Sequence, residues 1–176
     1  MDADTERFYA FEREARRRYE PDNPVDLSID ELAEIGELAL AAFGVNRFVM
    51  FADRHPFGRL AGSTSAFQSQ DTDGSVGLVY VIGLPRGRRR PWCVLHETAH
   101  VIAHVLSGVD SGHGGAFPKT CLALWRDFGG WPNNELVELA LAHGVVITAC
   151  EICGLPTNLP IVRCSAHLQR AEPWTD

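Results

Sequence analysis

Residues 91–108 read PWCVLHETAHVIAHVLSG. Pro91 suits the first turn of a helix, Gly108 suits the position after its end, and neither Pro nor Gly interrupts the residues between them. The apolar residues form a broad stripe at helical spacing, made of Val94, Leu95, Ala99, Ile102, Ala103 and Leu106. The stretch therefore predicts a largely buried helix.

Two histidines of this helix, His96 and His100, are one helical turn apart and so project from the same face. Two imidazoles in this arrangement can bind one zinc ion, and Glu97 can then act as a general base on a bound water. The alternative is a pair of core histidines with Glu97 in a salt bridge. Burying these three groups together without a metal is costly, which favours the zinc interpretation.

A zinc site of this kind needs a third protein ligand, and the best candidate is His113 in SGHGGAF, residues 111–117. The glycines let the chain reverse after the first helix, and a second helix is expected to begin near His113 and to end at Gly129. His104 lies two turns from His96, about 12 Å along the helix axis, so it is expected to pack or to support the site and not to share the ion.

A carboxylate from a later helix is the competing third ligand. Glu135 and Glu138 open an apolar helix expected over 134–143. Their alternative interpretation is a first helical turn that Asn133 or Asn134 caps, where acidic residues are favoured by the helix dipole.

His-Glu-x-x-His followed by Gly-His-Gly-x-x-Phe resembles the SprT-like zinc metallopeptidases, and the resemblance covers residues 91 to about 144. It implies that His96, His100 and His113 bind zinc and that Glu97 is the general base. It also implies a zincin-like peptidase domain, here residues 1–146. A peptidase family that cleaves regulators shares the first motif and would instead use a glutamate as the third ligand.

The tail, residues 147–176, contains two metal-type knuckles, each with two residues between its ligands. Cys150 and Cys153 form the first, and Cys164 and His167 form the second. This is the spacing of a closed structural zinc site, with a disulfide or free thiols as alternatives. The other two cysteines, Cys93 and Cys121, fall within expected helices and are predicted to be buried apolar residues.

The order of elements predicts an α+β fold, with N-terminal helices, a small and mainly antiparallel sheet, and then the motif helix and further helices. Ser28 and Glu31 form a capping box at the start of the second helix. By analogy with zinc peptidases, strand 75–84 should form the sheet edge, where an extended substrate could pair. Helices are expected over 5–19, whose apolar side carries Phe8, Phe11, Ala15 and Tyr19, and over 28–43; strands are expected over 47–52, 60–68 and 75–84.

Composition is that of one globular domain: 176 residues, 45% hydrophobic and 22% charged. The odd number of cysteines, the charged N-terminus and the lack of an 18-residue apolar stretch argue against a secreted disulfide scaffold, a signal peptide and a membrane helix. A cytoplasmic location is expected.

The basic run 86–90 could hold DNA phosphates, but the net charge of −7 favours a solvated loop.

Together these features predict a zinc-dependent metallopeptidase that acts on a protein or peptide substrate. The zinc activates a water molecule, and Glu97 accepts its proton and later passes it to the leaving amine. A non-catalytic, zinc-stabilised module that binds DNA or protein is the alternative. Glu97 favours catalysis, because a purely structural site gains nothing from a base at that position.

Overall fold

A computed structural model of the chain describes residues 2–22, 24–53, 63–70, 76–108 and 112–147. These ranges form an α+β fold of five helices and a three-stranded sheet, in agreement with the predicted class. None of the helices in this part of the chain has the length and apolar character needed to cross a membrane. The elements are α1 (Ala3–Tyr19), α2 (Ile29–Ala42), β1 (Val49–Ala52), β2 (Ser63–Gln70), β3 (Val76–Gly83), α3 (Pro91–Ser107), α4 (Phe117–Asp127) and α5 (Asn133–Ala142).

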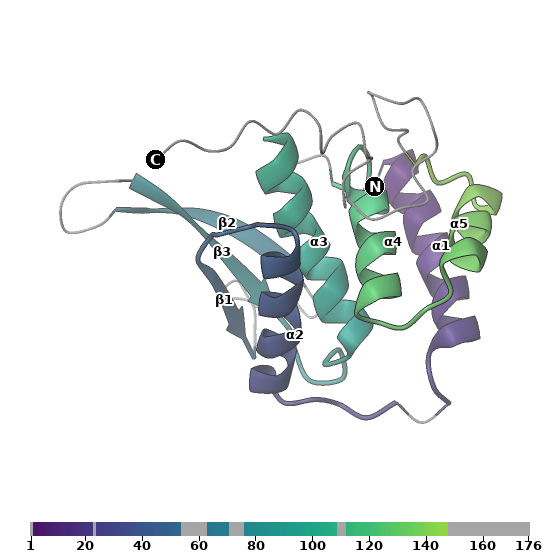
Figure 1. The fold of residues 1–176 in the computed structure, drawn as a ribbon, viewed down its shortest axis with the longest axis horizontal. Coiled ribbons are helices and arrows are strands. Elements are labelled where there is room, and N and C mark those ends of the chain that lie inside the picture. The colour runs from purple at the N-terminus through teal and green to yellow at the C-terminus, as the bar shows by residue number, and fades with distance from the viewer. Residues whose placement is uncertain (1, 23, 54–62, 71–75, 109–111, 148–176) are drawn as a thin grey trace.

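Helix α3 is the central element of the fold. The sheet and α2 lie on one side of it, and α4, α1 and α5 lie on the other (Figure 1). Every side chain from Trp92 to Ala99 is buried, because a helix that is covered on two sides has no extended solvent-facing surface. The helix ends at Gly108, whose positive φ of 70° gives the left-handed cap that glycine adopts without strain. The predicted buried helix is confirmed.

The sheet differs from the prediction in two respects. Its order is β1-β3-β2, so β3 is the middle strand and the expectation that residues 75–84 form the sheet edge is wrong. The pairing is mixed, since β3 runs antiparallel to β2 but parallel to β1, and the expected mainly antiparallel sheet is therefore only half right. A nearly continuous apolar run such as Val79 to Ile82 is typical of a strand that is covered on both faces, and it was a signal that β3 lies inside the fold.

Strand β2 is the edge of the described sheet nearest to α3. Its hydroxyl-rich start is tied to that helix, because the Thr64 hydroxyl lies 2.9 Å from the backbone oxygen of Glu97. This contact holds the start of β2 next to the histidine motif of α3.

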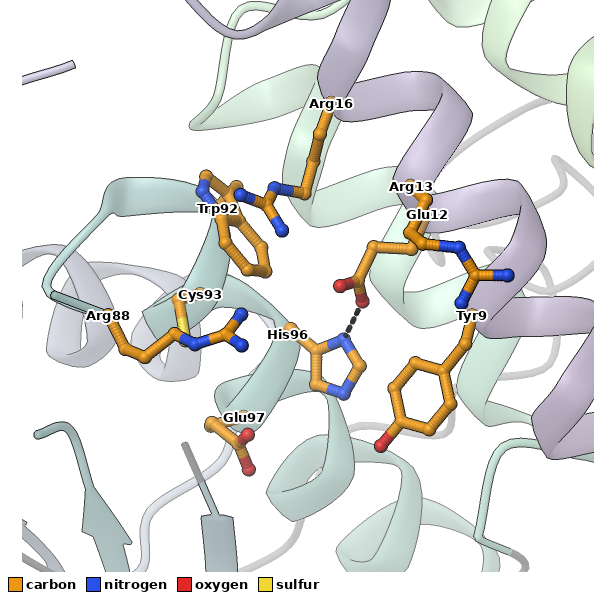
Figure 2. A pocket seen from close by; sticks show the side chains of 9 residues that line it. All are labelled: Tyr9, Glu12, Arg13, Arg16, Arg88, Trp92, Cys93, His96 and Glu97. Atoms are coloured by element: carbon orange, nitrogen blue, oxygen red, sulfur yellow. Dashed lines mark ion pairs between the residues drawn. The ribbon is translucent and has the colours of Figure 1, made fainter. Parts of the chain in front are cut away.

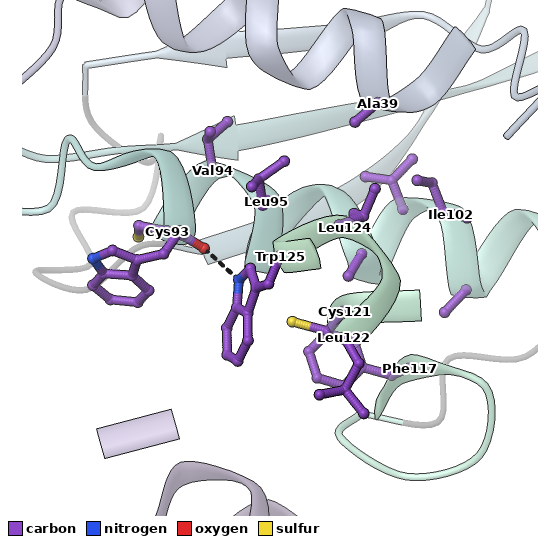
Figure 3. Close-up of a cluster of buried hydrophobic side chains, with 14 of the residues drawn as sticks. Ala39, Cys93, Val94, Leu95, Ile102, Phe117, Cys121, Leu122, Leu124 and Trp125 are labelled. Carbon is purple, nitrogen blue, oxygen red and sulfur yellow. Dashed lines mark hydrogen bonds between the residues drawn. The ribbon is translucent and has the colours of Figure 1, made fainter. Parts of the chain in front are cut away.

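Helix α1 packs its apolar side against α3 and α4, although it is the first element in the sequence. Phe8 meets Phe117 with ring centroids 4.9 Å apart, and Phe11 meets Trp125 at 5.8 Å. Trp125 in turn donates a hydrogen bond of 3.0 Å to the backbone oxygen of Trp92 on α3 (Figure 3). This aromatic packing brings α1 close to the histidines of α3.

Helix α2 begins as the sequence predicts. The Ser28 side chain accepts from the backbone N–H of Glu31, and the Glu31 carboxylate accepts from the backbone N–H of Ser28. The helix then covers α3 from the side of the sheet, where Leu32 and Ala39 are fully buried.

Candidate metal centre

Three histidines converge on one point beside Glu97. His96 and His100 come from α3, and His113 comes from the turn that precedes α4. One ring nitrogen from each lies within 4.8 Å of the other two, and the Nε2 atoms of His96 and His113 are 3.2 Å apart. The structure therefore brings together the three residues that the sequence selects, and their arrangement could hold a metal ion.

In two of these rings, Nδ1 contacts a neighbouring side chain on the side away from the other histidines. These contacts indicate which ring nitrogen is available to a metal ion. Thr5 donates its hydroxyl proton to Asp2 at 2.8 Å, so at its 3.4 Å contact with His113 it can only accept from Nδ1. Nδ1 of His96 likewise faces the Glu12 carboxylate at 2.8 Å, which favours a proton on that nitrogen. In the neutral form with the proton on Nδ1, each of these two rings has the lone pair of Nε2 directed inward.

Two such lone pairs at 3.2 Å repel each other unless a cation lies between them, either a proton on one ring or a metal ion. Two nitrogen ligands of a tetrahedral zinc ion, at about 2.0–2.1 Å from the metal, are themselves about 3.3 Å apart. The observed spacing is thus that of two imidazoles able to share one ion. The donor set of three histidines fits zinc as well as other borderline metals.

Glu12 is the buried partner of His96, a role that was not predicted for it from the sequence. The two side chains form an ion pair away from solvent, and neither atom of the pair has another hydrogen-bond partner in the described residues. Burial raises the pKa of Glu12, but the charge of His96 and its hydrogen bond outweigh this, so the pKa lies below the usual value. Burial likewise lowers the pKa of His96, and the charge of Glu12 reverses the shift, so that pKa is raised. Glu12 therefore orients the His96 ring and increases its basicity.

Glu97 is buried at the edge of the histidine cluster. The Thr64 hydroxyl of β2 lies 2.8 Å from Oε2, and Oε1 forms no hydrogen bond within the described part of the chain. Burial raises the pKa of Glu97, while the charge of His96 and the Thr64 hydrogen bonds oppose that shift only in part. Glu97 is therefore a carboxylate whose Oε2 is hydrogen-bonded to Thr64 and which binds a proton more strongly than an exposed glutamate does.

His100 completes the cluster from the next turn of α3. Its ring stacks on Phe117 with centroids 4.1 Å apart and an interplanar angle of 21°. Burial lowers the pKa of His100 well below the ordinary value, and the charges of His96 and His113 add to the shift. His100 is therefore neutral at physiological pH, which is the form of imidazole that binds metals.

The cluster lies where two cavities meet, and Tyr9, His96 and Glu97 line both of them. One cavity has a volume of about 520 Å³ and extends along β2, past Ser63 to Ala66, toward Tyr80 and His104. The other has a volume of about 300 Å³ and lies between α1 and the start of α3 (Figure 2). All three histidines line the larger cavity, and His96 also lines the smaller one. The two cavities together are called the cleft below, and each of them is one of its halves.

The remaining candidates lie away from the centre. His104 is outside the histidine group and contacts the Tyr80 hydroxyl at 3.1 Å, in agreement with the supporting role expected for it. Glu135 and Glu138 are exposed on α5, and Glu135 accepts a hydrogen bond from Tyr19, so the structure does not bring either to the histidines.

Two local predictions near these residues are wrong. Helix α4 begins at Phe117, so His113 lies in the preceding turn and not in the first turn of the helix. Helix α5 has Pro132 at its N-cap position and no side-chain cap, so neither Asn133 nor Asn134 caps it. The helix begins at Asn133, one residue earlier than the asparagine pattern suggested, and Pro132 before it has an extended backbone with ψ of 122°.

The basic run before α3 is partly neutralised. Arg89 pairs with Asp53, and Arg90 pairs with Asp26 at 2.8 Å, so these two arginines have partners within the chain. Cys93 and Cys121 are buried, as predicted. The predicted zinc knuckle lies outside the described residues; its four members are Cys150, Cys153, Cys164 and His167. The domain boundary predicted between residues 146 and 147 lies where the described part of the chain ends.

Four residues that contact the site were not assigned to it from the sequence: Thr5, Tyr9 and Glu12 of α1, and Thr64 of β2. One signal existed for Glu12. It lies four residues after Phe8 and next to Phe11, and is thus a charged residue on the apolar side of an amphipathic helix. A carboxylate in that position needs a buried partner.

Comparisons of this chain with protein-family models, with curated proteins and with solved structures found no match.

Proposed function

We propose that this protein is a zinc-dependent metallopeptidase. The observation that carries the proposal is the convergence of His96, His100 and His113 beside the buried carboxylate of Glu97, inside a cleft. Three histidines are a common ligand set of catalytic zinc, because they leave one coordination position open. When bound, the ion would supply Lewis-acid polarisation of a carbonyl group and activation of a water molecule. The SprT-like resemblance remains a prediction that rests on the same residues.

Glu97 is the proposed general base. Thr64 holds one of its carboxylate oxygens, which leaves Oε1 to accept a proton from the attacking water. The carboxylate would then pass that proton to the leaving amine. The raised pKa that burial gives to Glu97 supports both steps, because the proton must be taken up and later released near neutral pH.

The edge of β2 is the proposed site for the substrate backbone. Within the described sheet β2 pairs with β3 on one side, and Ser63 to Ala66 line the larger half of the cleft. An extended peptide in this half of the cleft would lie alongside β2. In this proposal the substrate lies beside β2, and not beside the strand at residues 75–84 as expected from the sequence.

The Tyr9 hydroxyl is the proposed donor to the substrate carbonyl oxygen. Its ring packs against His113 and lies parallel to His96, it lines both halves of the cleft, and its hydroxyl has no hydrogen-bond partner in the described residues. Burial, with the charges of Glu12 and Glu97, raises the pKa of Tyr9, so the hydroxyl keeps its proton. A donor aimed at a developing oxyanion strengthens as negative charge accumulates there.

Replacing Tyr9 with Phe should lower kcat about 10²-fold, the loss that follows removal of one oxyanion donor, and should leave zinc content unchanged. Steady-state hydrolysis and metal analysis of the same preparation measure both. Tyr19→Phe is the matched control, because its hydroxyl binds Glu135 away from the cleft. Equal activity in wild type and Tyr9→Phe would remove Tyr9 from the mechanism.

Replacing Glu12 with Gln should weaken zinc binding by about 10–100-fold, the usual effect of removing the carboxylate behind a histidine ligand. Competition with a chelator of known affinity measures the change, and circular dichroism checks that the fold is kept. Glu14→Gln is the control on the same helix, because Glu14 pairs with Arg17 and Arg18 at the surface. Equal affinities of the two variants would show that Glu12 does not orient His96.

Metal removal and replacement test the proposed function as a whole. The purified full-length chain is analysed for metals, treated with a chelator, and assayed on an unfolded protein before and after zinc is restored. We expect hydrolysis to stop on chelation and to return with zinc. Hydrolysis that persists in metal-free protein would refute the zinc mechanism, and a zinc-loaded chain that cleaves neither unfolded protein nor itself would favour the non-catalytic binding module.

A further inference from the structure

The smaller half of the cleft differs from the larger half in charge. Arginines 13, 16 and 88 line it together with Trp92 and Glu12 (Figure 2). The larger half is lined by hydroxyl and imidazole groups, and no lysine, arginine or aspartate is among its lining residues in the described chain. A substrate that extends from the candidate metal centre into the smaller half therefore meets arginine side chains that the larger half lacks.

The acidic groups of the smaller half are already engaged. Glu12 is paired with His96, and Glu97 is held by Thr64. Arg16 is also engaged, because it pairs with Glu20 at 3.1 Å and its guanidinium lies 3.9 Å from the ring centroid of Trp92. Neither Glu12 nor Glu97 therefore forms an ion pair with Arg13 or Arg88.

Of the three arginines that line this half, Arg13 and Arg88 have no carboxylate partner among the described residues. Arg13 is exposed on α1, and Arg88 is exposed in the loop before α3. Figure 2 shows them on opposite sides of the cavity, with His96 between them. Arg88 is near enough for its charge to lower the pKa of Tyr9 against the prevailing upward shift.

We propose that Arg13 and Arg88 bind a carboxylate of the substrate, so that the enzyme prefers an acidic group adjacent to the bond it cleaves. Because the cavity is lined by the same His96 and Glu97 that serve the reaction, the bound group lies within one or two residues of that bond. The guanidinium fork matches a carboxylate with two parallel hydrogen bonds. This inference deepens the proposed function and rests on it.

The carboxylate can have two sources, an Asp or Glu side chain or the C-terminus of the substrate. Both would use the same arginines, so peptides distinguish them. A DNA phosphate is a separate outcome of the test, disfavoured by the net charge of −7 and by a cavity of about 300 Å³ that is bounded by the Tyr9 and Trp92 rings.

The test uses fluorescently labelled peptides of Ala, Ser and Gly with one Glu or one Gln at successive positions, each with an amidated C-terminus, and a Gln peptide with a free C-terminus. Binding is followed by fluorescence anisotropy on the zinc-loaded full chain, and cleavage is followed separately by mass spectrometry. We expect a carboxylate-containing peptide to bind about tenfold more tightly than its amide counterpart, the value of a charge-assisted hydrogen bond at a partly exposed site.

The preference for a carboxylate-containing peptide should depend on Arg13 and Arg88. Arg88→Gln or Arg13→Gln should reduce it, and Arg88→Glu should invert it in favour of a peptide with Lys in place of Glu. Arg86→Gln is the matched control, because Arg86 is exposed in the same loop but does not line the cavity. The preference should also weaken with rising salt.

The outcomes separate this inference from the proposed function. Selective binding of acidic peptides without cleavage would support the carboxylate site and count against the peptidase. Cleavage without a difference between acid and amide peptides would keep the peptidase and overturn the carboxylate site. Equal binding of all peptides, binding of none, or a preference for an oligonucleotide that needs Arg88 would also overturn it.

Discussion

Glu97→Gln should lose peptide hydrolysis by at least about 10²–10⁴-fold, the contribution of general base catalysis, while the histidine site keeps its zinc. The amide keeps the size of the carboxylate and can still meet the Thr64 hydroxyl, which lies 2.8 Å from the wild-type Oε2. It cannot accept the proton of the attacking water. Single-turnover hydrolysis measures the loss, and mass spectrometric metal analysis measures the zinc.

Two further variants test whether the loss of hydrolysis is specific to the general base. Glu138→Gln changes an exposed glutamate of α5 and should behave as wild type. Thr64→Val removes the hydroxyl that holds Glu97 and should reduce activity less than Glu97→Gln does, since the base itself remains. Wild-type activity in Glu97→Gln would refute the mechanism, whereas loss of both zinc and activity would show that Glu97 is a ligand.

His113→Ala should lose one zinc ion per chain relative to wild type and lose activity with it. Two histidines from a single helix leave the ion with too few protein ligands, and catalytic zinc sites use three. The fold should survive, because the core that supports α3 is formed by the packing of α1, α2 and α4 around it and not by His113. Zinc content, circular dichroism and thermal unfolding of the same preparation check these points.

The difference from wild type is the quantity to compare, since the predicted cysteine knuckle could hold a second zinc. His143→Ala, at the C-cap of α5, is the matched control and should keep the full metal content. An unchanged zinc content and affinity in His113→Ala would remove this residue from the ligand set. Glu135 and Glu138 would then return as candidates, although the structure shows both exposed on α5.

The histidine motif was predictable because its geometry is local. An α-helix places residues i and i+4 on one face wherever it occurs, so His96 and His100 required only that residues 91–107 be helical. The apolar stripe, Pro91 and Gly108 made that prediction secure. The capping box of Ser28 and Glu31 is local in the same sense. His113 could be selected because glycines flank it and because a third ligand was needed, but its distance from His96 could not be calculated from the sequence.

The order of the strands was not predictable in the same way. Alternation and β-propensity describe one strand at a time, and they do not state which strand becomes its neighbour. An analogy placed the strand at residues 75–84 at the edge, and the structure places β3 in the middle. The edge that faces the cleft therefore belongs to β2, which supplies Thr64 to Glu97.

The sequence by itself determined the helix that carries the two histidines, the identity of the proposed base and the α+β class, because these depend on periodicity and on short-range geometry. Only the tertiary structure decided that Tyr9 and Glu12 face the histidines and that Arg13 and Arg88 flank one half of the cleft. An amphipathic pattern shows that a helix must bury one side, but it does not show against which partner. That choice depends on how the aromatic side chains of α1 pack between α3 and α4, and this is a property of the assembled core.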